Sequence, residues 1–288
     1  MTFVRLFACA SLALSVAGCG TPPSHDNPSA KTSFFPSANP LKAATIGDRI
    51  PMEPGAWVHP NRPARLSGRT LTVSSIHQIK LEPKEVILTF DDGPMPGKTE
   101  KVLADLDQYG VKATFLMVGQ MAKTYPALAR QVAARGHSIG SHTWRHADLR
   151  SMDYGLAVSE ILRGENAVKA ASGVDVGFFR FPYLSDTSRL RATLAQRGTV
   201  VLDVAIDSKD YFKTSSEGVI DRTMAALHRR QGGIILMHDI HKRTVNMLPE
   251  LLARLQSEGY QVVTLRYKRS RMPTLESAAI RNENRRPL

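Results

Sequence analysis

Residues 86–94 read VILTFDDGP, and this stretch decides how the rest of the chain is interpreted. It begins with an apolar, β-branched run that is typical of a buried strand, and it ends in a Gly-Pro pair that forces a turn. Asp91 and Asp92 therefore lie at the carboxyl end of a strand, where successive side chains point to opposite faces. One of these carboxylates can bind a metal ion while the other stays free to move a proton.

From residue 85 onward the chain alternates between short apolar runs and helical patterns. The apolar runs, which we interpret as strands, lie at 86–90, 113–118, 137–141, 176–181, 200–206, 233–237 and 261–265. Helical patterns lie between them, for example at 123–135, 154–171, 217–230 and 244–258. Strands separated by helices predict an α/β fold with a parallel sheet covered on its outside. A barrel or near-barrel of seven strands fits this spacing best, and an open doubly wound sheet is the main alternative.

The composition is that of a soluble globular protein, with 42% hydrophobic and 22% charged residues in a chain of 288. The net charge of +12 would suit nucleic acid, an anionic cell envelope or an acidic glycan. The sequence has no basic helix with interleaved aromatic residues and no zinc-finger spacing, so we do not expect a nucleic-acid partner.

The first nineteen residues are typical of a lipoprotein signal peptide. Arg5 precedes an apolar run over residues 6–16, which is too short to span a membrane and has the length of a signal h-region. The run leads into VAGC at 16–19, which resembles the bacterial lipoprotein processing box. We therefore expect lipidation of Cys19; a secretory signal that happens to contain a cysteine is the alternative. The expected location is the cell envelope, at the periplasmic face of the outer membrane or the cell surface.

Three segments outside the alternating region are assigned by composition. Residues 20–51 are rich in Pro, Ser, Ala, Asn and Thr and predict a flexible tether. Residues 52–83 form an N-terminal extension with strand-like pieces such as 70–73, for which a cover over the domain is one interpretation. The domain itself is expected at 84–267, and residues 268–288 form a basic tail.

Polar side chains follow several of the predicted strands, at the edge where functional groups gather in both candidate folds. His142 and His146 follow the third strand; four residues apart on one face of a helical turn, both imidazoles can reach one ion. With one carboxylate they make the ligand set of a catalytic zinc-type site that keeps a position open for water.

Further polar clusters follow the next three strands. They are RFPY at 180–183, DSKDY at 207–211 and LMHD at 236–239. Each has a structural interpretation: Arg180 as a surface ion pair, Asp210 as a helix cap and His238 as a buried, hydrogen-bonded histidine. Packing does not readily explain five such clusters at strand ends.

In order and spelling, these clusters resemble the motifs of the polysaccharide deacetylases, carbohydrate esterase family 4. The family motifs TFDDGP, H-[ST]-x-x-H, R-x-P-Y, D-x-x-D-W and L-x-H correspond to residues 89–94, 142–146, 180–183, 207–211 and 236–238. The resemblance covers about residues 84–267. It implies a distorted (β/α) barrel with fewer than eight strands, in keeping with the seven strands expected from the pattern.

The resemblance also implies roles for the site residues. Asp92, His142 and His146 would hold one divalent metal ion, with zinc expected and cobalt, nickel or manganese as alternatives. Asp91 would be the general base, and Arg180 would be its ion-pair partner.

A second group of residues would act on the leaving group and the substrate. His238 would be the general acid, oriented by Asp210, which we prefer over Asp207. The Tyr183 N–H would help to bind the oxyanion. Tyr211 and Leu236 would line the substrate groove.

The chain departs from the family pattern at two positions beside the expected groove. Tyr211 stands where Trp is usual, and Leu184 stands where Gly is often found. These departures affect the expected substrate more than the expected chemistry. We interpret His137 and His241, which lie near motif residues, as structural or surface histidines.

The expected function is metal-dependent hydrolysis of N-acetyl groups from an N-acetylhexosamine glycan, such as peptidoglycan, a chitin-like chain or poly-N-acetylglucosamine. No G-x-S-x-G elbow indicates an activated serine. Two alternatives stay open: an O-acetyl esterase acting on acetylated xylan-type glycan, and a catalytically silent glycan-binding lipoprotein. We expect a monomer whose partners are an acetylated amino-sugar glycan and, through the lipid anchor, a membrane.

Overall fold

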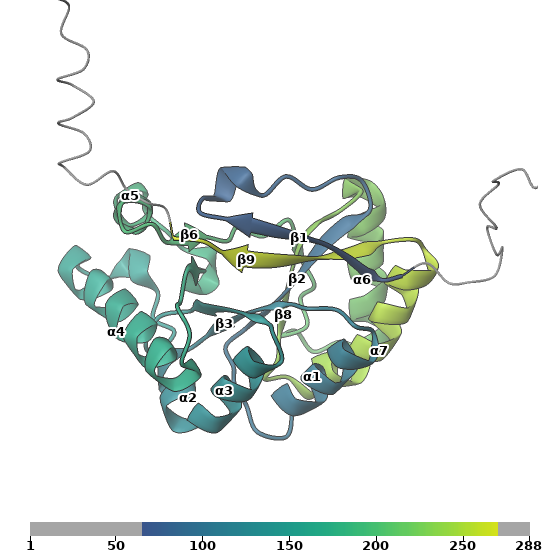
Figure 1. Ribbon diagram of the computed structural model, residues 1–288, viewed down its shortest axis with the longest axis horizontal. Coiled ribbons are helices and arrows are strands. Elements are labelled where there is room, and N and C mark those ends of the chain that lie inside the picture. Colours follow the sequence, from purple (N-terminus) through teal and green to yellow (C-terminus); the bar gives the residue numbers. More distant parts are fainter. Residues whose placement is uncertain (1–64, 270–288) are drawn as a thin grey trace, which may run out of the picture. The chain divides into compact units, whose positions relative to one another are not determined.

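Parallel strands and the helices that connect them organise residues 65–269, the part of the chain that the structure, a computed structural model, describes (Figure 1). The strands are β1 (Ser67–Val73), β2 (Glu85–Asp91), β3 (Thr114–Met117), β4 (Ser138–Ser141), β5 (Phe178–Phe179), β6 (Val200–Val201), β7 (Ile206–Asp207), β8 (Gly233–His238) and β9 (Gln261–Tyr267). The α-helices are α1 (Thr99–Gln108), α2 (Gly119–Thr124), α3 (Pro126–Ala134), α4 (Tyr154–Ser172), α5 (Ser188–Gln196), α6 (Ser216–Arg230) and α7 (Lys242–Ser257). The predicted signal peptide with Cys19, the tether and nearly all of the basic tail lie outside the described residues.

All strand pairs of the described sheet are parallel, which confirms the predicted α/β class. The order is β1-β9-β2-β3-β4-β5-β6, and β8 pairs with both β2 and β7. No pairing joins β6 to β7 in the described sheet, so the barrel stays open there. The fold is therefore a distorted barrel with a gap between β6 and β7.

Along the strands, side chains that point outward alternate with side chains that point inward. What packs against the inward side chains distinguishes the barrel from a doubly wound sheet. In β2, Val86 and Leu88 point outward and belong to a hydrophobic cluster that also contains residues of the α-helices. Ile87, between them, points inward and belongs to a second cluster. The inner cluster joins Ile87 to Phe178 and Val200 from the far side of the sheet, with no α-helical residue among its buried members. A doubly wound sheet would have helices on both faces.

Two predicted elements differ from the observed ones. The single strand expected at 200–206 is two short strands, β6 and β7, because the chain leaves the sheet between them. The helix expected at 123–135 is divided into α2 and α3 at Tyr125, since Pro126 disfavours the helical conformation of the residue before it. The strand-like piece expected at 70–73 is part of β1, which pairs with β9.

The amino ends of β4, β5 and β6 meet β9, which runs across them. The Tyr267 hydroxyl donates to the carbonyl of Gly198, 3.0 Å away, and the Tyr267 ring lies edge-on to Phe178. The Ser138 hydroxyl donates to the Leu265 carbonyl. Apolar side chains of residues 71–81 pack against the same inner cluster. The end of the barrel opposite the strand carboxyl ends is therefore covered.

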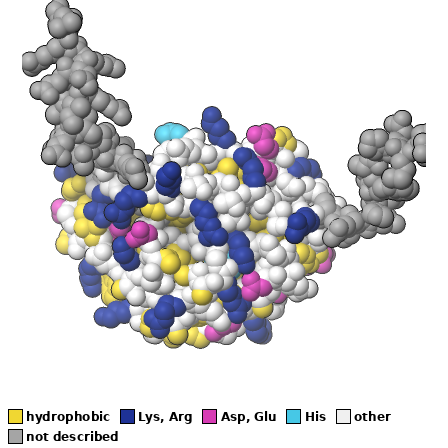
Figure 2. Space-filling model, viewed as in Figure 1, with side chains coloured by type: hydrophobic (Ala, Val, Ile, Leu, Met, Phe, Trp, Pro, Cys, Tyr) yellow, Lys and Arg dark blue, Asp and Glu magenta, His cyan; other side chains and the backbone are white. Residues whose placement is uncertain are grey.

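The surface of the described part carries many basic side chains. Figure 2 shows Lys and Arg side chains spread over one face, with few acidic side chains among them. Among residues 65–269, no helix has both the length and the apolar character that crossing a membrane requires.

Candidate metal and catalytic site

The carboxyl ends of several strands open into one cavity of about 470 Å³. Residues lining it include Asp91, Asp92, His142, His146, Phe181, Tyr183, Leu184, Asp207, Tyr211, Leu236, His238 and His241. All site residues predicted within the described part line this cavity except Arg180 and Asp210, which lie directly behind its wall and contact lining residues. The structure therefore brings the predicted residues together.

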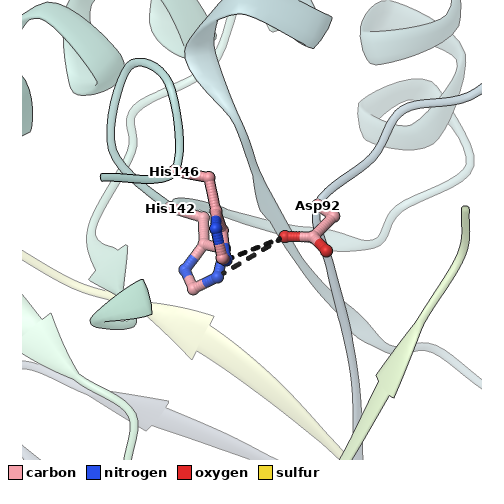
Figure 3. A group of neighbouring side chains, drawn as sticks. All are labelled: Asp92, His142 and His146. Carbon is pink, nitrogen blue, oxygen red and sulfur yellow. Dashed lines mark ion pairs between the residues drawn. The ribbon is translucent and has the colours of Figure 1, made fainter. Parts of the chain in front are cut away.

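Asp92, His142 and His146 form what we call the ligand cluster. The Oδ1 atom of Asp92 lies 3.6 Å from Nε2 of His142 and 3.4 Å from Nε2 of His146 (Figure 3). One ligand atom from each residue lies within 4.8 Å of the others. Asp92 Oδ1 is buried and has no hydrogen-bond partner in the described part of the chain, so it is available as a ligand.

The two histidines do not lie on a helical turn, contrary to the prediction. They flank a non-helical turn after β4 in which Thr143 and His146 both adopt positive φ. The Thr143 hydroxyl accepts a hydrogen bond from the His146 N–H at 3.0 Å, which stabilises this turn. The histidines still converge, with ring centroids 4.8 Å apart, because the turn folds back on itself.

The chemistry of the donor set fits one divalent ion. Nδ1 of His142 lies 2.8 Å from the carbonyl oxygen of Arg180, which must accept its proton; Nε2 therefore keeps its lone pair for a metal. Burial and the neighbouring His142 lower the pKa of His146, which favours the neutral form that binds metals. Two imidazole nitrogens and one carboxylate oxygen are a set that suits zinc and related ions.

Asp91 faces Arg180 as well as the ligand cluster. Nη1 of Arg180 donates to Asp91 Oδ1 and to the Thr89 hydroxyl, both at 2.7 Å, and its Nε donates to the Leu202 carbonyl. Arg180 is 1% exposed, so the interpretation of it as a surface ion pair is wrong. The other oxygen of Asp91 lies 3.7 Å from His142 Nε2. Asp91 is thus held next to the ligand cluster by a buried cation.

The adjacent Asp91 and Asp92 both line the cavity, although strand alternation would send them to opposite faces. Asp91 is the last residue of β2 and points inward, like Ile87 and Thr89. Asp92 has a φ of 77°, which ends the strand geometry. Its side chain is thereby turned back towards the same cavity.

His238 and Asp210 form a second charged pair in the site. Asp210 accepts hydrogen bonds at 2.7 Å from Nδ1 and from the backbone N–H of His238 and is itself fully buried. Burial alone would lower the pKa of His238, but the hydrogen bond to Asp210 and nearby carboxylates raise it to about 9. Burial would raise the pKa of Asp210, but the bonds from His238 outweigh it and the pKa is lowered. The pair is therefore an imidazolium and a carboxylate at neutral pH.

Asp207, the other carboxylate considered for His238, has different partners. It accepts hydrogen bonds from the Lys209 N–H at 2.9 Å and from the Tyr211 hydroxyl at 2.8 Å. Of the two carboxylates, Asp210 contacts His238, and Asp207 holds the Tyr211 ring against the cavity.

Tyr183 contributes a backbone donor at the cavity. It has a φ of 57°, and Leu184 after it has a φ of 54°, so the chain makes a tight reversal here. No acceptor for the Tyr183 N–H is found among residues 65–269. The Tyr183 ring lies edge-on to His146, with centroids 4.6 Å apart. An unused N–H next to the ligand cluster can bind an oxyanion.

Sequence reasoning missed some contacts at this site. The Thr244 hydroxyl donates to Asp210, and His241 lines the cavity 5.6 Å from the His238 ring, although we interpreted it as structural or surface. His137 lies outside the cavity as a buried acceptor for the Ala113 N–H, and burial lowers its pKa to about 3. The position of His241, three residues after the predicted acid at the start of a helix, is the signal that could have identified it.

Comparison with known proteins shows where the chain belongs. The polysaccharide deacetylase family model matches residues 78–202. A chitooligosaccharide deacetylase of Bradyrhizobium is 30% identical over 194 residues, which are 62% of this chain and 88% of that protein. The chain belongs to the polysaccharide deacetylase family.

Other relatives in the polysaccharide deacetylase family are longer. The peptidoglycan-N-acetylglucosamine deacetylase PgdA of Listeria monocytogenes is 33% identical over 182 residues, which are 63% of this chain but 38% of that relative. Among solved structures, a peptidoglycan deacetylase of Bdellovibrio bacteriovorus matches with a TM-score of 0.66 and 32% identity. That match covers 72% of this chain and 61% of the other.

Proposed function

We propose that this polysaccharide deacetylase-family protein is a metal-dependent hydrolase that removes N-acetyl groups from an N-acetylhexosamine glycan. The observation that carries the proposal is the placing of a base and an acid beside the ligand cluster. Asp91, paired with buried Arg180, and His238, with a pKa of about 9, are register partners on β2 and β8. Both side chains line the cavity that contains the ligand cluster.

Each group has a task that amide hydrolysis requires, because an amide is a poor electrophile with a poor leaving group. A divalent ion on the ligand cluster would supply, when bound, the Lewis acid that polarises the acetyl carbonyl. Asp91, fixed by Arg180, takes the proton of the attacking water. The Tyr183 N–H donates to the oxyanion, and His238 gives its proton to the departing amine.

The substrate class is supported by the names of the relatives. They include deacetylases of peptidoglycan N-acetylglucosamine and of chitooligosaccharide, whose acetyl groups are bound as amides. We therefore propose peptidoglycan or a chitin-like chain as the substrate. An O-acetyl esterase is less favoured. The alcohol that leaves an ester depends less on protonation by an acid such as His238 than the amine that leaves an amide.

Acetate release tests the proposal. Purified full-length protein is stripped of metal, reloaded with zinc or cobalt, and incubated with N-acetylglucosamine oligomers and with peptidoglycan. We expect acetate from at least one substrate with metal and none without it. Tight glycan binding without acetate release under either metal would instead indicate the silent glycan-binding protein.

We further propose that Cys19 is lipidated and anchors the protein in the cell envelope. The support is the VAGC box at 16–19 and the Pro- and Ser-rich stretch after it. Replacing Cys19 by serine is expected to move the protein from the membrane fraction to the soluble fraction of cells. Unchanged fractionation of Cys19→Ser would contradict the anchor.

A further inference from the structure

A row of four rings passes along one wall of the cavity and continues beyond it. His241, His238, Tyr211 and Phe212 follow one another with ring centroids 5.6, 5.4 and 4.7 Å apart. The first three rings line the cavity, and Phe212 does not. The row therefore leads from the candidate acid to an aromatic ring outside the reaction cavity.

Phe212 is placed as a contact surface rather than as a core residue. Its side chain is 53% exposed, and it belongs to no hydrophobic core cluster in the described part of the chain. It lies in the loop between β7 and α6, beside Tyr211. With Tyr211, which is 42% exposed, it places two exposed aromatic rings at this edge of the cavity, on which the apolar face of a sugar ring can stack.

Two lysines flank this ring in the same loop. Lys209 and Lys213 are exposed, and neither is in an ion pair among residues 65–269. The two carboxylates of the loop are already occupied, Asp210 by His238 and Asp207 by the Lys209 N–H and the Tyr211 hydroxyl. The ammonium groups are therefore free to attract an anion.

Two arginines add to the positive charge behind the loop. Arg222 donates to the Ser208 carbonyl at 3.0 Å, and Arg243 donates to the Asp210 carbonyl at 2.6 Å. Both bonds go to neutral oxygens, and neither arginine is in an ion pair in the described residues. The loop and the adjoining helices α6 and α7 thus carry four basic side chains without an ion-pair partner in the described residues.

We propose that Phe212, Lys209 and Lys213 form an outer subsite, which binds the sugar next to the one being deacetylated and favours a glycan that bears carboxylate groups. This inference rests on the proposed function and narrows its substrate class. Phe212 stacks on the neighbouring sugar, and the two ammonium groups attract carboxylates of the chain. Those carboxylates can belong to the sugars themselves or to attached peptides.

The test compares three substrates for the full-length, metal-loaded protein. They are a neutral N-acetylglucosamine tetramer, a tetramer containing N-acetylmuramic acid without peptide, and the same tetramer with peptide stems. We expect kcat/KM at low salt to be roughly tenfold higher for the acidic tetramers than for the neutral one, as two partly screened charge contacts allow. The second and third substrates distinguish sugar carboxylates from peptide carboxylates.

Charge removal tests the lysines. Lys209→Asn with Lys213→Gln is expected to reduce the acidic-to-neutral ratio to about twofold or less, and high salt should reduce the wild-type ratio in the same way. Asparagine is chosen because Lys209 has a φ of 55°, which asparagine tolerates. The matched control removes Lys80 and Lys101, two exposed lysines that do not line the cavity, and should keep the wild-type ratio.

The role of the Phe212 ring is tested with glycan substrates of different length. Phe212→Ala is expected to raise KM for the tetramers about fivefold, with kcat and the KM for the N-acetylglucosamine monosaccharide, which has no sugar for the outer subsite, much less affected. Phe212→Tyr should retain the wild-type KM. Equal ratios in wild type and the lysine variant, or equal KM values for Phe212→Ala and wild type, would overturn the outer subsite. No acetate from any substrate would instead contradict the proposed function.

Discussion

Asp91 and Asp92 are chemically identical neighbours whose surroundings separate them. Asp91 is 2% exposed and bonded to a buried guanidinium, whereas Asp92 turns towards two imidazoles. The positive φ of Asp92 turns its side chain into the cavity that Asp91 also lines, so the two carboxylates face one site with different partners. The pair can therefore be tested one residue at a time.

Replacing Asp91 by asparagine is expected to reduce kcat by about 10²–10⁴-fold, the usual contribution of a general base. The metal content should stay at the wild-type value, because the ligand cluster does not include Asp91. Acetate release and elemental analysis of the same preparation measure the two effects. His142→Ala is the matched variant and should lose both activity and metal; loss of metal from Asp91→Asn would contradict the separation of roles.

Replacing Asp210 by asparagine is expected to move the alkaline limb of the kcat/KM profile to lower pH. A general acid works while it is protonated, so activity falls as the pH rises through the pKa of His238, about 9. Asp210 raises that pKa through a hydrogen bond and its charge; without the charge, the limb should move down by roughly one to three pH units.

Asp207→Asn is the matched control for this experiment. Asp207 lies in the same loop and binds the Tyr211 hydroxyl, but it makes no hydrogen bond to His238. Its alkaline limb should stay near the wild-type position. A limb that moves equally in both variants would show that Asp210 does not control the acid.

At the scale of elements, the packing of β9 against the closed end of the barrel depends on one glycine, Gly177. A Cβ atom on Gly177 would lie 1.9 Å from the ring of Tyr267, and Gly198 supplies the carbonyl that binds the Tyr267 hydroxyl. The Tyr267 ring of β9 can therefore lie against the chain before β5 only because residue 177 has no side chain.

Gly177→Ala is expected to lower the free energy of unfolding by about 1–3 kcal/mol, because the ring or the strand must shift. Urea unfolding of the full-length protein measures the change. Gly155→Ala is the control: its Cβ would have open space in α4, so it should be neutral or slightly stabilising. Equal stability of Gly177→Ala and wild type would contradict the tight contact.

At the scale of the whole molecule, metal binding should be coupled to stability. When the free zinc concentration is a hundred times the Kd for the folded chain, binding stabilises the folded state by about 2.7 kcal/mol. The thermal midpoint of metal-stripped protein should therefore rise on adding zinc. His77→Ala, an exposed histidine outside the cavity, should keep this rise, and His142→Ala should lose it. An equal rise in both variants would indicate that zinc binds elsewhere.

Much of the site is predictable from sequence, because its residue types stand in short motifs at strand ends. The carboxylate pair after β2 and the histidines after β4 are examples, and parallel strands bring their carboxyl ends to one edge. The residues that support the site through hydrogen bonds are harder to predict from the sequence. Thr89 lies within β2 and Thr244 at the start of α7, and threonine is too common at such positions to point to Arg180 or Asp210.

The irregular parts of the fold were the hardest to predict. Periodicity reports which side chains are apolar, but strand pairing depends on residues distant in sequence. The strand β1 pairs with β9, which lies at the other end of the domain in sequence. The apolar run at 200–206 is paired only at its two ends, in β6 and β7. The positive φ values of Thr143 and His146 likewise depend on the turn around them rather than on their residue types.

The position of β2 determines when the site can be assembled during synthesis. β2 ends at the carboxylate pair and is flanked by β3, β8 and β9, and the last two are translated at the end of the domain. A nascent chain therefore contains all three residues of the ligand cluster long before β8 and β9, which flank β2, have left the ribosome. The ligand residues are therefore translated before the strand pairing of β2 is complete, because parallel pairing joins distant segments.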